Sequence, residues 1–472
     1  MRSTAAVGFD PDIAQTRFGY GLSPKVAGPA DVAEMMAFLR AQEVQMPRFP
    51  FPSDAEMREK MLALLNARRK ISKAEKGSDA QQALQKAYKA ARRASKQEGA
   101  KWIGATLARR VWSRDALRER LVAFWNDHFS APGKNVIYRY TEPAYVANAI
   151  RPHVGGRFED MLIAAVLHPQ MLHFLDQNNS VGPNSSIAKK RPQKNLGLNE
   201  NLAREILELH TLGVGGGYTQ EDVRQLAELL TGVTTIQKEG TAYLSKRAEP
   251  GAETILGKDY GTRRARMSDV HAVLRDLARH PDTARHIARK LAVHFVSDTP
   301  DEDLLVSMGA RYLETDGDLA EVIEAMLRHP AAWAAVGNGA GNFKQPELFV
   351  SSALRALAVP KIQLREVKSH QLERLLGTPL RTMGQPWRRP FGPDGFEEGD
   401  THWLTAQGMA ARLQWALGVP AEVLDALPDP RDFVQTTLGT SAPASARFAA
   451  EAAENRREGI ALVLMSPAFQ RV

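Results

Sequence analysis

The chain has 472 residues, a formal net charge of +8 and no cysteine. Without cysteine it cannot form a disulfide, a thiolate nucleophile, a zinc–thiolate site or an iron–sulfur cluster. The length fits one large domain or two intimate ones, and the composition is that of an ordinary globular protein rich in helix-forming residues. We therefore expect residues 1–472 to form a single, mainly α-helical domain.

Residues 1–24, MRSTAAVGFDPDIAQTRFGYGLSP, lack the apolar core of a signal peptide, and no apolar run is long enough to span a membrane. As written, the chain is expected to be cytoplasmic, or to leave the cell together with a partner. Part of the positive charge lies in residues 68–101. Elsewhere no stripe of arginine and lysine alternates with aromatic residues, so nucleic acid is not an expected partner.

Residues 55–110 have the pattern of two long helices that break near Gly77 and Ser78. An extended connector, residues 44–53, precedes them. The basic helical hairpin near 55–105 is expected to project from the body as an arm, because it is densely charged and has no broad apolar stripe. Its Lys/Arg face either stays solvated or binds an acidic partner.

The segment 113–131 is expected to form an amphipathic helix, with Leu117, Leu121, Trp125 and His128 on its apolar side. Two interpretations of this histidine remain open. It is either a packed core histidine bonded to a backbone carbonyl, or a base or ligand beneath aromatic walls.

Residues 197–235, GLNENLAREILELHTLGVGGGYTQEDVRQLAELLTGVTT, are the most informative stretch of the chain. Asn199 is a natural N-cap for the first helix. Glu200, Arg204 and Glu208 then follow at i, i+4 spacing on one side of the helix. This polar side is either a solvated ladder or a buried site in which the arginine orients a carboxylate.

Two further residues of that helix are candidates for chemistry. Glu205 shares the polar side, where an arginine could orient it for acid–base or metal work. His210 projects with the apolar residues instead. Gly213 can supply the left-handed residue that ends the helix, and Thr219 with Asp222 can cap the next one.

The remaining signals are a strand region and a long loop. Val233–Ile236, Ala242–Leu244 and Thr254–Leu256 predict a small β-sheet or hairpin region near 233–258. Residues 384–403, GQPWRRPFGPDGFEEGDTHW, are too aromatic for a linker, and Trp387 and Trp403 are expected to cover a surface or line a pocket.

Several of these blocks carry a resemblance to a known family. The chain resembles the bacterial family catalogued as domain of unknown function 1800, nearly from end to end. The resemblance rests on these blocks, in this order: RFGYGLSP at 17–24, FWNDHFS at 124–130, HPQMLHFLDQNNSVGPNS at 168–185, LNENLAREILELHTLGVGGGYTQEDVRQLAELLTG at 198–232, HPDTARHIARKLAVHFVSDTP at 280–300, GQPWRRPFGPDGF at 384–396, HWLTAQGMAARLQWA at 402–416 and the terminal SPAFQRV.

The resemblance implies a largely helical fold and no established reaction. It also implies a partner, because members are often encoded beside a sulfatase-like family, domain of unknown function 1501, whose members tend to carry export signals. Two positions depart from the family pattern. Ala248 stands where relatives commonly have histidine, and Phe396 stands where they usually have tryptophan.

Two functions from different classes follow. The first is a non-catalytic binding or assembly protein that acts with a sulfatase-like partner or a polymer. The alternative is an acid–base or metal-assisted hydrolase, whose metal and cofactor the sequence does not identify. The candidate catalytic residues are His128, Glu205, Glu208 and His210, and the candidate binding residues are Asn199, Glu200, Arg204, Trp387 and Trp403.

Overall fold

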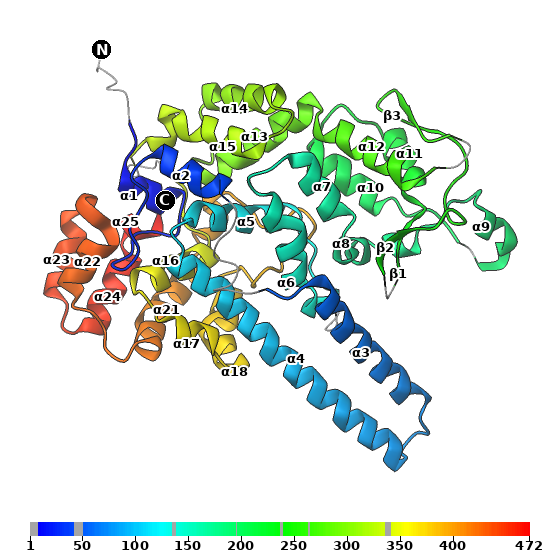
Figure 1. Cartoon of the computed structure of the whole chain (residues 1–472). Coiled ribbons are helices and arrows are strands. Elements are labelled where there is room, and N and C mark those ends of the chain that lie inside the picture. The colour runs from blue at the N-terminus through cyan, green and yellow to red at the C-terminus, as the bar shows by residue number, and fades with distance from the viewer. Residues whose placement is uncertain are drawn as a thin grey trace.

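The computed structural model describes residues 8–41, 51–134, 138–194, 196–236, 239–262, 265–335 and 341–472. It is mainly α-helical with two short pairs of strands (Figure 1), so the predicted fold class is confirmed. Most of the connector expected at 44–53 lies outside the described residues.

The first half of the described chain is helical. Its elements are α1 (Pro11–Arg17), α2 (Val32–Arg40), α3 (Asp54–Lys73), α4 (Asp79–Trp112), α5 (Ala116–His128), η2 (Tyr138–Tyr140), α6 (Glu142–Tyr145), η3 (Val146–Ile150), η4 (Arg151–His153), α7 (Phe158–Val166), α8 (Pro169–Phe174), η5 (Gln177–Asn179), α9 (Ser186–Lys190), η6 (Pro192–Lys194), α10 (Asn201–Glu205), η7 (Ile206–Thr211) and α11 (Gln220–Leu230).

Four short strands follow, in the region where the sequence predicts them. β1 (Val233–Ile236) pairs with β2 (Gly240–Tyr243), and β3 (Glu253–Ile255) pairs with β4 (Lys258–Tyr260), both antiparallel. The strands form two separate hairpins and not one sheet. The reason lies in their packing, because β1 contacts α8 whereas β3 contacts α11.

The second half returns to helices. These are α12 (Met267–Ala278), α13 (Pro281–Phe295), α14 (Glu302–Glu314), α15 (Leu319–Arg328), η8 (Pro330–Trp333), α16 (Pro346–Ala356), α17 (Lys361–Arg365), α18 (Ser369–Leu372), η9 (Glu373–Gly377), α19 (Thr378–Thr382), α20 (Asp400–Trp403), α21 (Ala406–Val423), α22 (Pro430–Leu438), η10 (Gly439–Ser441), α23 (Ala444–Ala452), α24 (Arg456–Met465) and α25 (Pro467–Gln470).

Two hydrophobic clusters form the core. The first cluster contains residues of α5, of α7 and of the helices from α10 through α15, and it buries large side chains such as Trp125 and Phe158. The second joins the end of α4 to α16 and to α21 through α24, around residues such as Phe349 and Trp415. In Figure 1 the helices α21 to α24 gather on one side of the molecule and α7 to α12 on the other. Helix α5 belongs to the first cluster and lies between these two sides in the view of Figure 1.

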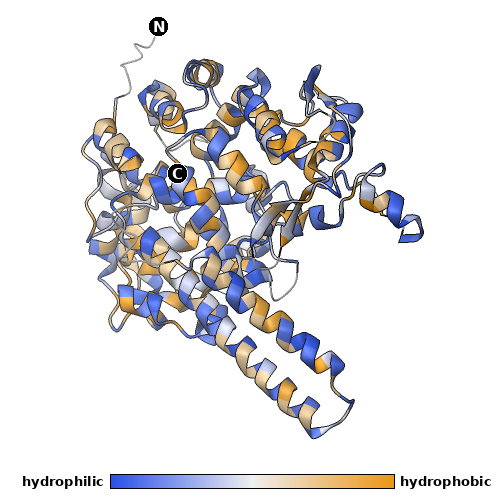
Figure 2. Cartoon of the chain, turned by 45° about the vertical axis from the view of Figure 1, so that its right-hand side comes forward, coloured by the Kyte–Doolittle hydropathy of each residue, from blue (hydrophilic) through white to orange (hydrophobic). Residues whose placement is uncertain are grey.

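The helices α3 and α4 form an arm that projects from the body (Figure 1). The side chain of Ser53 caps α3 and that of Ser78 caps α4, so the break falls where the sequence predicts it. Hydrophilic residues recur along both helices (Figure 2), and only a narrow seam that includes Met61 and Leu64 is buried between them. The last turns of α4, from Ala100 onward, enter the second cluster.

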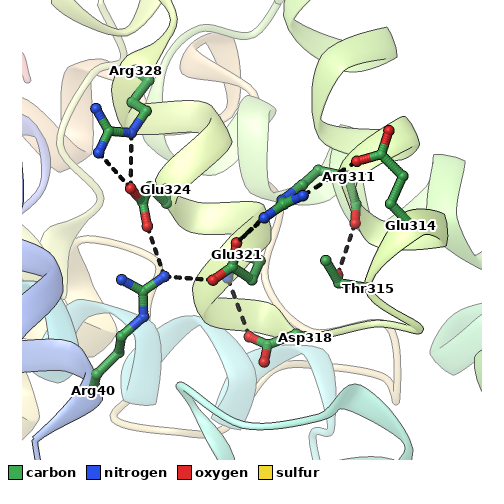
Figure 3. Close-up of polar contacts among 8 residues, drawn as sticks. All are labelled: Arg40, Arg311, Glu314, Thr315, Asp318, Glu321, Glu324 and Arg328. Atoms are coloured by element: carbon green, nitrogen blue, oxygen red, sulfur yellow. Dashed lines mark hydrogen bonds and ion pairs between the residues drawn. The ribbon is translucent and has the colours of Figure 1, made fainter.

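A surface network of ion pairs connects α2 to α14 and α15 (Figure 3). Arg40 lies 2.6 Å from Glu321 and 2.6 Å from Glu324, both on α15. Arg311 on α14 pairs with the same Glu321, and Arg328 lies 2.6 Å from Glu324. Shared carboxylates of this kind hold three helices in register, although each exposed pair contributes at most about 1 kcal/mol.

Candidate functional site

A polar cavity of about 70 Å³ lies where α5, the end of α13, the start of α16 and the segment after α19 meet. We name it the inner cavity. A volume of this size holds a few water molecules or the reacting group of a substrate. Its polar walls are Tyr20, Arg110, Arg120, Asn126, Asp127, His294, Asn342, Gln345, Glu347, Gln385, Arg388 and Glu398.

One face of α5 forms a wall of this cavity. The helix is anchored in the first cluster by fully buried side chains such as Leu121 and Trp125. Ala123, Asn126 and Asp127 are incompletely buried, and all three line the cavity. Their i, i+3, i+4 spacing places them on the same side of the helix. The helix thus presents Asp127 to the cavity while His128, one position later, faces the core.

A chain of hydrogen bonds crosses the cavity wall from α5 to α13. The guanidinium of Arg120 lies 3.3 Å from Nε2 of His294, and Nδ1 of this histidine donates to the carboxylate of Glu398 at 2.9 Å. Gln345 also donates to Glu398, at 3.0 Å.

Three carboxyls line the inner cavity, and two of them, Asp127 and Glu398, have pKa values shifted in opposite directions. Burial, and then the neighbouring Glu398, raise the pKa of Asp127 to about 8, although the N–H of Phe396 donates to this carboxyl at 3.0 Å. Burial also acts to raise the pKa of Glu398, but His294, Lys290 and Arg120 outweigh it and hold that pKa below its ordinary value. Near neutral pH Asp127 therefore carries a proton and Glu398 a charge.

An ion pair between Arg110 and Glu347 forms another part of the cavity wall. Arg110 lies 2.6 Å from Glu347, and both side chains are largely buried. Gln385 links this wall to the previous one, because it accepts from the backbone N–H of Glu347 at 2.7 Å and donates to Gln345 at 2.7 Å. The positions of these polar groups are therefore fixed before any ligand enters.

Arg388 also lines the cavity, and its backbone is strained. Its φ of 49° lies in the left-handed region, which a residue with a side chain seldom adopts. Its Nε is buried and finds no hydrogen-bond partner among the described residues. Burial lowers the pKa of Arg388 to about 10. A strained backbone together with a buried Nε that lacks a hydrogen-bond partner is a feature of ligand sites more than of structural ones.

The two predicted histidines, His128 and His210, lie beside each other inside the first cluster. His128 donates from Nε2 to the backbone carbonyl of His210 at 3.3 Å, and their rings lie 5.6 Å apart. His286 on α13 lies 6.2 Å from His128. Burial is the main cause that lowers the pKa of all three, to about 3 for His210 and about 4 for His286. His128 and His210 lie among aromatic rings, His286 is half-buried, and none of the three lines the inner cavity.

The predicted glutamates lie on a neighbouring surface. Burial, then Glu208 and then Asp394, raise the pKa of Glu205 to about 7. Both glutamates are half-buried, and the loop that contains Asp394 also contributes Phe396 to the inner cavity. Within the described residues, no group of three or more histidine and carboxylate side chains is arranged to hold a metal ion.

The ladder at the start of α10 is solvated. Arg204 lies 3.3 Å from Glu200, and the two side chains are 40% and 35% exposed. Arg204 also donates to Gln220 at 2.9 Å. The helix begins at Asn201 with Glu200 at the N-cap position, and the side chain of Asn199 accepts from the N–H of Asn201 at 2.9 Å. These three predicted binding residues thus stabilise the helix start on the surface.

The two predicted tryptophans support the loop between α19 and α20. Trp403 is buried and donates from Nε1 to the carbonyl of Glu397 at 2.9 Å, next to Glu398. Trp387 is half-buried, with the guanidinium groups of Arg110 and Arg388 at 5.2 and 5.5 Å from its ring. Trp403 therefore fixes the backbone next to the cavity residue Glu398 without lining the cavity itself. Trp387, in contrast, remains partly exposed.

The position where relatives commonly have histidine lies elsewhere in the fold. Ala248 is buried, and the carboxylate of the next residue, Glu249, accepts from the backbone and side chain of Asn184 at 2.9 and 2.6 Å. None of these residues lines the inner cavity. The alanine therefore leaves the polar groups of that cavity unchanged.

The sequence patterns missed Asp127, His294, Glu398 and Arg120 as site residues. The first is adjacent to the predicted His128, and a signal existed on α13, where His286, Lys290 and His294 recur at i, i+4 spacing. No local pattern shows that these residues come together, because Asp127 lies on a helix and Glu398 in a Gly/Pro-rich loop far along the chain.

Comparison with known proteins gives one match. The sequence model of a family described as "Protein of unknown function (DUF1800)" matches residues 13–471. No curated protein and no solved structure matches the chain. Blocks 17–24, 124–130, 280–300 and 384–396, on which the resemblance rests, each contribute residues to the inner cavity. None of the helices in the described ranges is long and apolar enough to cross a membrane.

Proposed function

Because the chain belongs to the DUF1800 family, whose description names no activity, we propose from its own geometry that it is an acid–base hydrolase. The observation that carries the proposal is the pair of carboxyls in the inner cavity, Asp127 and Glu398, whose surroundings shift their pKa values in opposite directions. Such a pair supplies a proton donor and a proton acceptor at the same pH.

The step balances with water as the second reactant. Glu398, held by His294 and Gln345, takes a proton from a water molecule, whose oxygen attacks the substrate. Asp127 gives its proton to the leaving oxygen, so that one bond breaks and one forms. Exchange of a proton with solvent then restores both carboxyls. The small cavity admits the bond to be broken, and the rest of the substrate lies outside it.

The test combines a substrate screen with two isosteric variants. A panel of chromogenic esters, glycosides, phosphates and sulfates is assayed with the wild type, Asp127→Asn and Glu398→Gln. Each variant is expected to lose about 10²–10⁴-fold in turnover, the usual contribution of general acid–base catalysis. The activity of the wild type should fall above about pH 8, where Asp127 releases its proton.

Controls separate this result from unfolding and from metal chemistry. Asp425→Asn changes an exposed carboxylate and should leave activity unchanged. Melting temperatures check the fold of each variant, and elemental analysis of the native protein reports any bound metal.

Infrared spectroscopy tests the proton on Asp127 without a substrate, through a protonated-carboxyl band at pH 7 that Asp127→Asn removes. Full activity in either cavity variant would reject the proposal.

The projecting arm favours a second candidate, a non-catalytic binding or assembly role. The arm projects from the body (Figure 1), and most of its lysine and arginine side chains are exposed. A partner protein of the sulfatase-like domain of unknown function 1501 type, or an acidic polymer, would contact it through charge. Co-purification with such a partner should therefore weaken as salt is added. Salt-independent association, or association that survives removal of the arm, would speak against this role.

A further inference from the structure

A second and larger pocket, of about 680 Å³, opens between the middle of α4, the segment around η2 and α6, and the helices α18 to α19. We name it the outer pocket. It is separate from the inner cavity, and Arg388 is the one residue of the described chain that lines both. A volume of 680 Å³ is in the range of small-molecule sites.

The outer pocket is strongly basic. Six cationic side chains line it against two carboxylates, Glu142 and Glu373. Glu373 is paired with Arg381. Glu142 is raised in pKa by burial, and accepts from the N–H of Gly133 at 2.8 Å. Cationic side chains thus outnumber carboxylates three to one in the lining of the pocket.

Three arginines converge on one part of this wall. Arg139, Arg388 and Arg389 all act electrostatically on the carboxyl of Glu142. None of the three has an ion-pair partner within hydrogen-bonding distance in the described part of the chain, and Nε of Arg388 is buried without any hydrogen bond. Guanidinium groups without oxygen partners at a pocket wall are arranged to receive an oxyanion.

Two tryptophans supply an apolar wall. Trp102 and Trp387 both line the pocket and both are half-buried. The Nε1 of Trp102 is buried and has no hydrogen-bond partner among the described residues. Flat aromatic walls pack against flat or apolar ligand groups. Both rings are part of the pocket lining, so a ligand that enters the pocket would contact them.

We propose that the outer pocket binds a small molecule in which an oxyanion is attached to a flat apolar body. The arginines Arg139, Arg388 and Arg389 receive the oxyanion, and Trp102 and Trp387 contact the body. The oxyanion is a phosphate, sulfate or carboxylate group, since these share the geometry that a guanidinium fork recognises. The proposal does not depend on hydrolysis in the inner cavity.

The experiment is calorimetric titration of the full chain with three probes that cannot be hydrolysed: phenylphosphonate, benzenesulfonate and benzoate. Benzyl alcohol is the neutral probe. Saturable binding of at least one anion is expected, and the tightest of the three identifies the class of the natural group. Arg389→Ala and Arg139→Ala should each raise Kd about tenfold, because each removes one charge-assisted hydrogen bond.

The matched control is Arg93→Ala, an exposed arginine of α4 that does not line the pocket and should change Kd less than about twofold. Arg139 and Arg389 are themselves exposed, so melting temperatures of all variants should equal that of the wild type. Arg389→Lys should recover part of the affinity. The proposal is overturned by absence of saturation with all three anions, by equal binding of benzyl alcohol, by equal loss in Arg93→Ala, or by tighter binding of a thymidine oligonucleotide.

Discussion

Asp127 and Glu398 occupy the same cavity and differ in protonation because of what touches them. Asp127 receives one backbone hydrogen bond and faces the negative charge of Glu398. Glu398 receives hydrogen bonds from His294 and Gln345 and lies near Arg120. Differences between neighbours therefore determine the chemistry of two identical functional groups.

Stability should depend on pH through Asp127. From about pH 4 to pH 8 the folded protein holds a proton there that the unfolded chain has released, so this carboxyl makes folding less favourable as the pH rises. Asp127→Asn removes the effect. Between pH 5 and pH 8, the free energy of unfolding of the variant should rise by on the order of a few kcal/mol relative to that of the wild type.

Chemical denaturation at both pH values measures this difference, with Asp425→Asn as the exposed control. An Asp127→Asn variant whose stability follows the same pH dependence as the wild type would show that Asp127 is charged in the folded protein.

Two arginine–glutamate pairs should respond very differently to truncation. Arg151 binds Glu119 through both carboxylate oxygens, at 2.9 and 2.6 Å, and both side chains are buried. Arg151→Ala leaves the buried carboxylate of Glu119 without its cation and should lower the free energy of unfolding by roughly 3–5 kcal/mol. Arg204→Ala removes a pair on the surface and should cost below about 1 kcal/mol. Urea denaturation of the two variants side by side decides the matter, and similar losses would contradict this account.

Local patterns predict the elements well because their signals are local. Thr219 accepts the N–H group that it is expected to cap, α4 begins after the break predicted near Ser78, and Gly213 has the positive φ, 87°, that ends a helix. The π-helical turn η7 could not be predicted. It adds a residue to one turn, and tertiary packing selects it by burying His210 beside His128.

The arm should be the first helical region that a protease opens. Lys73 and Lys76 lie at its exposed tip, where α3 ends and the chain turns toward α4. Trypsin is expected to cut there first, because local opening is easiest where few apolar contacts must break. The two fragments should remain associated, since Met57 and the end of α4 are buried. Mass spectrometry with gel filtration tests both statements, and an earliest cut within the body would disprove the first.

At the scale of the whole molecule, Arg355 on α16 connects distant segments. It is fully buried and donates to the carbonyl of Gly21 at 2.9 Å, and to those of Arg110, Val111 and Ser113 at 2.9 to 3.1 Å. Arg355→Met leaves these carbonyls without their donor, which should cost several kcal/mol. Scanning calorimetry should show a lower Tm than for the exposed control Arg365→Met. An equal Tm for the two variants would show that Arg355 does not stabilise the contacts between these segments.

The candidate site could not be predicted from the sequence, because its residues come together only when the whole chain is folded. Tyr20, Asp127, His294 and Glu398 come from four separate segments, and each looks unremarkable beside its own neighbours. The predicted residues His128 and His210 do meet, but burial keeps both neutral within the core. Helical periodicity tells which side of a helix is apolar, and it does not tell which polar residue faces a cavity.

The arm also makes the molecule easy to observe. At 1.5 Å per residue, the 34-residue α4 is about 51 Å long. The chain contains no cysteine, so Lys76→Cys would create one unique thiol at the tip for a fluorescent or spin label. A second cysteine on the body would make the pair a molecular ruler. The distance distribution between the labels would then report, in solution and in real time, whether the arm swings when another molecule docks.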